Sequence, residues 1–129
     1  MKKYIRATSG LYEVISDKVE TYYDKPCYKV SNKNINKYNI VTVDSVIDES
    51  DKIEDLISEW GVQWKDHSKW PGYQTNLTLS DILRYWNRNE KHSGIEKIFG
   101  LVWVKSRDGF DDLRVVVEYH PDTKTFTWR

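Results

Sequence analysis

The feature that most limits the fold of this chain is its C-terminal third, where three apolar-rich runs are joined by two short turn sequences. The first run, residues 97–105, is apolar on both faces, as is typical of a strand in the centre of a sheet. The runs 113–120 and 124–129 alternate apolar and polar residues with the period of a half-buried strand. An Asp-Gly pair lies in one connection and a Pro-Asp pair in the other, and both favour tight turns. The pattern predicts a three-stranded antiparallel meander.

Two segments in the middle of the chain, residues 51–61 and 78–88, have the apolar period of a short helix. In each segment, four apolar side chains fall at i, i+3, i+4 and i+7, which places them on one stripe of a helix. The stripes are Ile53, Leu56, Ile57 and Trp60 in the first segment, and Leu79, Ile82, Leu83 and Trp86 in the second. An acid three residues after Asp51 and another three residues after Thr78 resemble the capping box that starts a helix. We therefore expect two short amphipathic helices.

The N-terminal third predicts further strands over residues 2–8, 11–15 and 21–30, with Pro26 forcing an edge or a break in the last of them. Residues 38–47 predict a strand that leads into the first helix. The expected fold class is α+β: a mostly antiparallel sheet, with two short amphipathic helices packed on one face. The chain of 129 residues has the length of one domain, so we expect residues 1–129 to form a single domain.

Charge and cysteine content limit the classes of function. The formal net charge is zero, which argues against a dedicated nucleic-acid-binding domain, although residues 44–59 hold seven acids and one lysine, a net charge of −6. A strongly acidic segment suggests either a basic partner or carboxylates gathered at a helix start. The single cysteine, Cys27, cannot form an internal disulfide, which favours the cytoplasm. No apolar stretch is long enough to predict a membrane span.

The connection between the expected helices has an unusual composition, because aromatic and basic side chains alternate in it without a hydrophobic period. The candidate binding residues there are Trp64, Lys65, His67, Lys69, Trp70 and Tyr73. Three interpretations stay open. The rings could cover the core, anchor a protein partner, or stack on the bases of a single-stranded nucleic acid.

Catalytic patterns are weaker. Asp112, Glu118 and His120 lie on and beside one expected strand, in an order loosely like that of metal-dependent hydrolases that hold Mg²⁺ between carboxylates. The simpler interpretation is the polar face of a strand. The three histidines lack the spacing of a zinc site, and no phosphate-binding loop or nucleophile motif occurs. We therefore expect a protein that is not an enzyme and has no metal and no cofactor.

Residues 49–60, "ESDKIEDLISEW", and residues 98–128, "IFGLVWVKSRDGFDDLRVVVEYHPDTKTFTW", resemble small uncharacterised proteins of Gram-positive phages and mobile elements. Those proteins have a "SDNIEELCDEF"-like helix start and a "YGAIWTSKGLIYVAKM"-like hairpin, whose glycine and tryptophan match Gly100 and Trp103. The hairpin turn is longer in this chain, and the tryptophan-rich middle differs. The resemblance covers about half of the chain and implies only a setting.

Together these observations lead us to expect a small cytoplasmic non-enzymatic binding protein of phage or mobile-element origin. It would act by stoichiometric contact with a host protein, with inhibition of a defence system as one form of that activity. The alternatives are a nucleic-acid-binding module that uses residues 64–73, and a small metal-dependent hydrolase.

Overall fold

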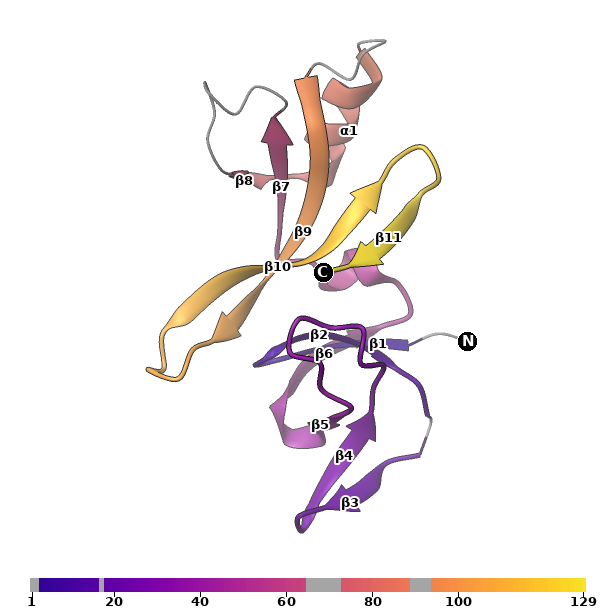
Figure 1. The fold of residues 1–129 in the computed structure, drawn as a ribbon, viewed down its shortest axis with the longest axis vertical. Helices are drawn as coiled ribbons and strands as arrows, with labels where there is room; N and C mark the ends of the chain where they lie inside the picture. The colour runs from indigo at the N-terminus through magenta and orange to yellow at the C-terminus, as the bar shows by residue number, and fades with distance from the viewer. Residues whose placement is uncertain (1–2, 17, 65–72, 89–93) are drawn as a thin grey trace.

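The computed structural model describes residues 3–16, 18–64, 73–88 and 94–129, and most of its regular structure is β-strand (Figure 1). The strands are β1 (Lys3–Ala7), β2 (Gly10–Val14), β3 (Glu20–Tyr22), β4 (Lys25–Lys29), β5 (Ile40–Thr42), β6 (Val46–Ser50), β7 (Glu59–Trp64), β8 (Tyr73–Leu77), β9 (Ile95–Lys105), β10 (Asp111–His120) and β11 (Thr125–Trp128). The helices are the α-helix α1 (Leu79–Arg88) and the single 3₁₀ turns η1 (Val43–Ser45) and η2 (Ile53–Leu56).

The largest sheet has five strands in the order β11-β10-β9-β7-β8, and all of its pairings are antiparallel. The predicted meander is present in it as β9, β10 and β11. Strand β9 lies between β10 and β7, which explains why its sequence is apolar on both faces.

The prediction of an α-helix in residues 51–61 was wrong. Residues Ile53–Leu56 form one 3₁₀ turn, and β7 begins at Glu59. The turn starts after Lys52, and no side chain caps it, so Asp51 does not act as the expected cap. Within β7, Trp60 and Val62 are both buried, and they lie two positions apart, which is the spacing of side chains on one face of a strand. Pairing with β8 and β9 on both sides satisfies the backbone of β7, and this tertiary pairing overrides the local helical period.

The second helix is present as α1, and its predicted start is confirmed. The hydroxyl of Thr78 accepts a hydrogen bond from the N–H of Asp81 at 3.1 Å, as an N-cap residue does. Ile82 on the apolar stripe is buried against the five-stranded sheet. Among the described residues, no helix combines the length and the apolar character of a membrane span.

The expected α+β class is therefore also wrong. The described residues form three antiparallel sheets with one short α-helix, instead of one sheet with two helices on one face. The two smaller sheets, in the orders β2-β1-β6 and β3-β4-β5, come from residues 3–50 and are drawn in the lower half of Figure 1. The strand expected over residues 38–47 is divided, because η1 separates β5 from β6 and sends them to different sheets.

Pro26 lies in β4, the middle strand of its sheet, yet its position satisfies the rule for proline. It pairs with Thr21 of β3, whereas β5 pairs with β4 only from Cys27 to Lys29. Pro26 is one position beyond the pair Tyr22–Lys25 that flanks the two-residue turn, so its backbone nitrogen faces away from β3, on the side where β5 does not pair with it. The missing N–H therefore breaks no hydrogen-bond ladder.

Three clusters of buried side chains form the core. The N-terminal cluster consists of Ile5, Ala7, Tyr12, Val30 and Val41. The central cluster consists of Leu11, Ile53, Leu56, Val102, Val104, Val116 and Val117. The helix-side cluster consists of Trp60, Val62, Ile82, Ile95 and Ile98. The central cluster contains residues of β2, η2, β9 and β10, so it connects the β2-β1-β6 sheet to the large one.

Candidate functional site

The six residues predicted to form a binding loop are only partly covered by the structure. Trp64 is the last residue of β7, and it is half-buried against the helix-side cluster. Lys65, His67, Lys69 and Trp70 lie outside the described residues, and Tyr73 is the first residue of β8. Their role in binding therefore stays a prediction.

The residues of the hydrolase hypothesis do not come together. Asp112 pairs with Val104, and Glu118 pairs with Phe99. Partners that lie directly opposite each other share a face, and positions 99 and 104 of one strand lie on opposite faces. A bulge between Val115 and Val117 causes this change of face within β10. Asp112 and Glu118 therefore cannot bind one metal ion together.

His120 and Asp112 also already have hydrogen-bond or ion-pair partners within the fold. The Nε2 atom of His120 lies 2.7 Å from the Thr127 hydroxyl, and Arg114 binds Asp112 through Nε at 3.1 Å. Within the described part of the chain, no group of three acidic, histidine or cysteine side chains is placed to hold a metal.

The acidic segment 44–59 does not gather at a helix start, as one interpretation expected. Asp48 and Glu49 lie on β6, and Glu54 and Asp55 lie in η2. Lys3 forms an ion pair with Glu49 at 3.0 Å, and this hydrogen bond raises the pKa of Lys3. The Ser50 hydroxyl donates to Asp55 at 2.8 Å. Part of this charge is therefore used within the fold.

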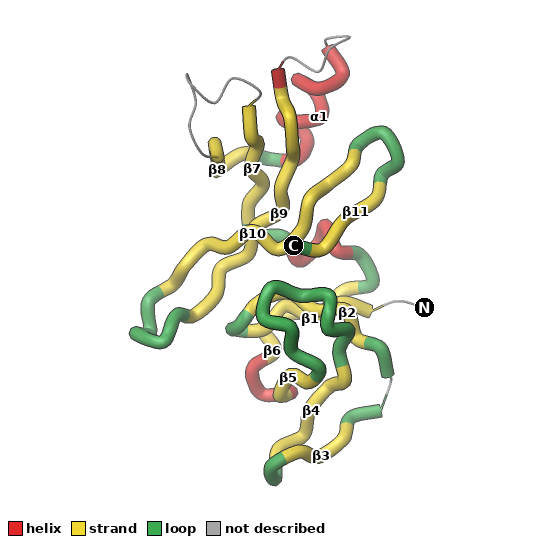
Figure 2. The backbone as a smooth tube through the Cα atoms, in the orientation of Figure 1, coloured by secondary structure: helices red, strands yellow, loops and turns green. Residues whose placement is uncertain are grey.

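The strongest candidate interaction surface is the outer end of the β9–β10 hairpin, residues 103–113, which we call the hairpin arm. It extends away from the body of the molecule (Figure 1; Figure 2). Two of its aromatic side chains are exposed: Trp103 to 43% and Phe110 to 75%. Leu113 is the cross-strand partner of Trp103, so an apolar side chain lies beside that ring on the same face.

The base of the hairpin arm is fixed. The N–H of Lys105 donates to the carbonyl of Thr8 at 2.8 Å, and the N–H of Trp103 donates to the Ser58 hydroxyl at 3.3 Å. The opposite face of β9 contributes Val102 and Val104 to the central cluster. Because the outer edge and one face of β9 are held, the arm presents Trp103 from a rigid support.

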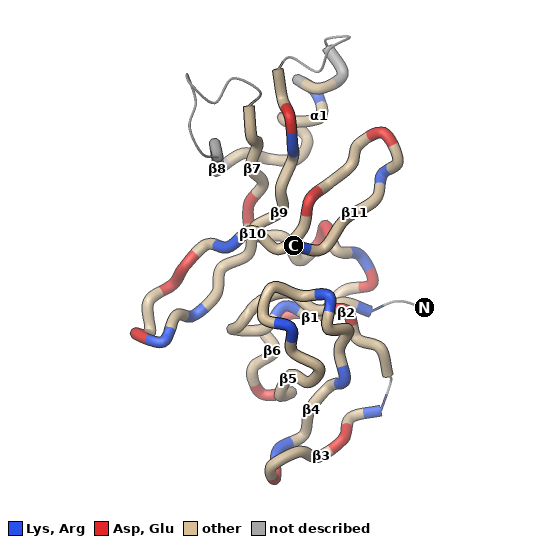
Figure 3. The backbone as a smooth tube through the Cα atoms, in the orientation of Figure 1, with Lys and Arg blue, Asp and Glu red and all other residues tan. Residues whose placement is uncertain are grey.

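The tip of the arm is a hydrogen-bonded turn. The N–H of Ser106 donates to the carbonyl of Phe110 at 2.9 Å, and the N–H of Gly109 donates to the carbonyl of Ser106 at 3.0 Å. Gly109 has φ +82°, a conformation that glycine adopts without strain. Lys105 and Asp111 close the turn with an ion pair at 2.9 Å. Charged pairs thus flank the exposed rings, as the polar rim of an interface does (Figure 3).

The sequence indicates the exposed residues of the hairpin arm only weakly, because the apolar pattern of β9 continues into the arm without a change. The 97–105 run predicts a central strand, and this is correct only up to Leu101, the last residue that β7 covers. Beyond Leu101, β9 extends past the end of its pairing with β7. Trp103 is therefore exposed, although the apolar pattern of the sequence is unchanged. Phe110 directly follows an Asp-Gly turn pair, where an aromatic residue has no core to enter.

Comparison with known proteins finds no matching family model, no similar curated protein and no similar solved structure. The geometry of the chain itself is therefore the basis for the functional argument.

Proposed function

We propose that this chain is a small non-enzymatic binding protein that acts in the bacterial cytoplasm by stoichiometric contact with a protein partner. The hairpin arm makes this contact. We further propose that the partner is a host protein and that the contact inhibits a defence system. This rests on the resemblance of residues 49–60 and 98–128 to proteins of phages and mobile elements.

The observation that supports the proposal is the exposure of Trp103 and Phe110 on a rigid, projecting hairpin. Tryptophan and other aromatic residues dominate the binding energy of protein interfaces, because they bury a large area with few rotatable bonds. The fixed base of the arm lowers the entropy that binding removes. Phe110 at the turn would enter a partner's groove, and Trp103 with Leu113 would cover its wall.

The test compares three forms of the full chain, each immobilised and exposed to a lysate of a Gram-positive bacterium. The wild type should retain a partner at fixed stoichiometry, and the double variant Trp103→Thr, Phe110→Thr should retain less than about one tenth as much, as expected for two interface anchors. Threonine removes both rings, and at Trp103, which lies in β9, it preserves strand propensity.

Tyr23→Asn is the control, since Tyr23 is 95% exposed in the β3–β4 turn, far from the arm in Figure 1, and asparagine tolerates its φ of +52°. The control should bind as the wild type does. Melting curves must show the double variant within about 0.5 kcal/mol of wild type, the range of surface substitutions. Equal retention of the same partner by the folded double variant would refute the role of the arm.

A further inference from the structure

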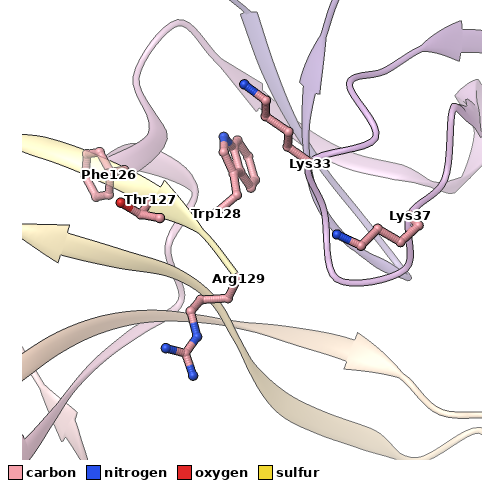
Figure 4. A pocket seen from close by; sticks show the side chains of 6 residues that line it. All are labelled: Lys33, Lys37, Phe126, Thr127, Trp128 and Arg129. Carbon is pink, nitrogen blue, oxygen red and sulfur yellow. The ribbon is translucent and has the colours of Figure 1, made fainter.

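A pocket of about 390 Å³ lies between the loop after β4 and the C-terminal strand, on a part of the surface separate from the hairpin arm (Figure 4). Its lining residues are Lys33, Lys37, Phe126, Thr127, Trp128 and Arg129. Three of them are basic and none is acidic. The volume falls in the range of small-molecule sites.

One wall of the pocket is β11, an edge strand of the large sheet. Its register places Phe126 and Trp128 on one face and Thr127 on the other. The N–H of Arg129 donates to the carbonyl of Val116 in β10 at 3.0 Å. Neighbouring residues point their N–H groups to opposite sides, so the N–H of Trp128 is directed away from β10, to the free edge.

The aromatic ring of Trp128 in this wall is held in place by a contact with a second ring. The Trp128 ring packs against Tyr4 with ring centroids 6.3 Å apart, and it remains half-buried. Arg129 points away from the two lysines in Figure 4. Its guanidinium lies 5.0 Å from the centroid of the Phe99 ring, and one of its nitrogens lies 3.9 Å from a Glu118 carboxylate oxygen. The available positive charge of the pocket therefore comes chiefly from Lys33 and Lys37.

The opposite wall is the loop of residues 31–39, whose conformation is fixed by Asn34. This side chain is 2% exposed, and it is the one polar or charged residue buried among those that the structure describes. Its amide donates to the carbonyls of Ser31 at 2.8 Å and Tyr38 at 2.9 Å. Its carbonyl oxygen accepts from the N–H groups of Asn36 at 3.1 Å and Tyr38 at 3.0 Å. The loop is thus ordered without regular structure.

Asn36 ties the same loop to the turn between β1 and β2. Its amide donates to the Ser9 carbonyl at 2.9 Å and to the Tyr12 hydroxyl at 3.1 Å. Tyr12 is fully buried in the N-terminal cluster, and its burial raises the pKa of its hydroxyl. The backbone of both pocket lysines is therefore held in place before any ligand arrives.

The two lysines also lack a charge partner in the described part of the chain. Lys3, Lys29 and Lys105 each form an ion pair with a carboxylate there, whereas Lys33 and Lys37 form none. Lys37 adopts φ +57°, a conformation that few non-glycine residues take up. The loop hydrogen bonds hold this lysine in place despite that cost.

We propose that this pocket binds a phosphate-bearing ligand with a planar ring, of the size of a mononucleotide. Lys37, whose ammonium group points toward the end of β11 in Figure 4, binds the phosphate, the flexible side chain of Lys33 turns toward it from the same loop, and the ring lies against Trp128. A phosphate monoester carries a charge of about −1.5 to −2 at neutral pH, which two lysines balance. An indole supplies a stacking surface that accepts any base. The zero net charge of the chain disfavours a long nucleic acid as the ligand.

The experiment is calorimetric titration of the full chain with AMP, using two double variants of equal charge. Lys33→Glu, Lys37→Glu removes the site, and Lys25→Glu, Lys52→Glu is the control at exposed lysines outside the pocket. The wild type should bind AMP saturably. The pocket variant should bind at least about tenfold more weakly, as expected for the loss of charge-assisted hydrogen bonds, and the control should bind within about twofold of wild type.

Further probes separate the parts of the ligand. Adenosine and inorganic phosphate should each bind more weakly than AMP, because each lacks one half of the recognition. The arm variant Trp103→Thr, Phe110→Thr should bind AMP normally, which keeps this proposal independent of the function proposed above. Four results would overturn it: no saturable AMP binding, equal affinity in the pocket variant, phosphate as tight as AMP, or affinity for oligo-dT that rises with its length.

Discussion

At the scale of single residues, Asn34 is the position where one side chain determines the shape of a loop, the one that forms a wall of the proposed ligand pocket. It makes four hydrogen bonds to the backbone of residues 31–38 and is almost fully buried. Asn34→Ala should therefore destabilise the protein by at least about 2 kcal/mol, because several buried backbone groups lose their partners. Urea melts measure this.

Asn32→Ala is the control in the same loop, since Asn32 is exposed. It should cost less than about 0.5 kcal/mol. If both substitutions cost the same, the hydrogen bonds of Asn34 do not hold the loop. Asn34→Ala should also weaken AMP binding, because the two pocket lysines lose their fixed positions.

Tyr12 is a buried group that contributes to the change of stability at alkaline pH. Burial raises its pKa, so the unfolded chain ionises this phenol near pH 10 while the folded chain still keeps it neutral. The contribution of Tyr12 is therefore fully present below about pH 10 and is lost as the pH rises through the higher folded-state pKa.

Tyr12→Phe should flatten this alkaline loss while costing about 1 kcal/mol or more at pH 7, through its lost hydrogen bonds to Ser9 and Asn36. The other groups with raised pKa values still contribute alkaline loss in both forms: Lys3, Tyr4, Tyr22 and Lys29. Urea melts at pH 7 and above pH 10 measure the difference, with the exposed Tyr23→Phe as the control. An equal alkaline loss of stability in wild type and Tyr12→Phe would contradict the assignment.

The roles of Asn34 and Asn36 could not be predicted from the sequence. The segment 31–39 contains four asparagines and predicts only a polar loop. Asn34 is buried because carbonyl groups of its own loop accept hydrogen bonds from its amide. Asn36 binds the carbonyl of Ser9, which lies 27 positions away in the chain. Likewise, Lys33 and Trp128 meet only because β11 and this loop border one pocket.

At the scale of elements, the segment 53–60 shows why the apolar period alone misled. Positions i and i+3 fit a single 3₁₀ turn as well as a helix, Ile57 at i+4 follows that turn with extended backbone, and Trp60 fits a strand that starts one residue earlier. The segment 78–88 has the same period but also a working cap at Thr78, and no strand pairs with it. The meander was predictable because its alternation and its turns are both local.

Gly100 tests how η2 and the residues after it dock on the large sheet. A Cβ atom at this position would lie 2.8 Å from both Ile57 Cδ1 and Val117 Cγ2. Gly100→Ala should therefore destabilise the protein by about 1–3 kcal/mol through overpacking. Ile57→Val removes one of the two contacting methyl groups, so Gly100→Ala should cost less in that background.

A double-mutant cycle from urea melts measures this coupling. Gly100→Ala within about 0.5 kcal/mol of wild type would show that Ile57 does not pack closely on β9. Identical costs in both backgrounds would mean that Val117 alone opposes the added methyl group.

At the scale of the whole molecule, the central cluster is the contact that we expect to couple the two ends of the chain into one folding unit. It brings Leu11 of β2 against Val102 and Val116 of the large sheet, together with η2. The N-terminal cluster on one side and the helix-side cluster on the other do not share a buried residue. Cooperativity between the two ends therefore depends on the central cluster.

The sequence supplies a separate probe for each end. All six tryptophans lie between positions 60 and 128, so tryptophan fluorescence reports on the C-terminal half. The single cysteine, Cys27, is 1% exposed in β4, so its reaction with a thiol reagent reports on the N-terminal half. In the wild type we expect the two probes to give the same urea midpoint, as a single cooperative transition requires.

Leu11→Ala should separate these two midpoints. The substitution removes a side chain that is 1% exposed in the central cluster and should cost about 2–5 kcal/mol in that contact region. Val41→Ala in the N-terminal cluster is the matched control: it should lower both midpoints together, because the connection between the halves is intact. Coincident midpoints in Leu11→Ala would mean that the two halves are coupled by contacts other than the central cluster. Separate midpoints already in the wild type would mean that the chain folds as two units, contrary to the single domain that its length predicts.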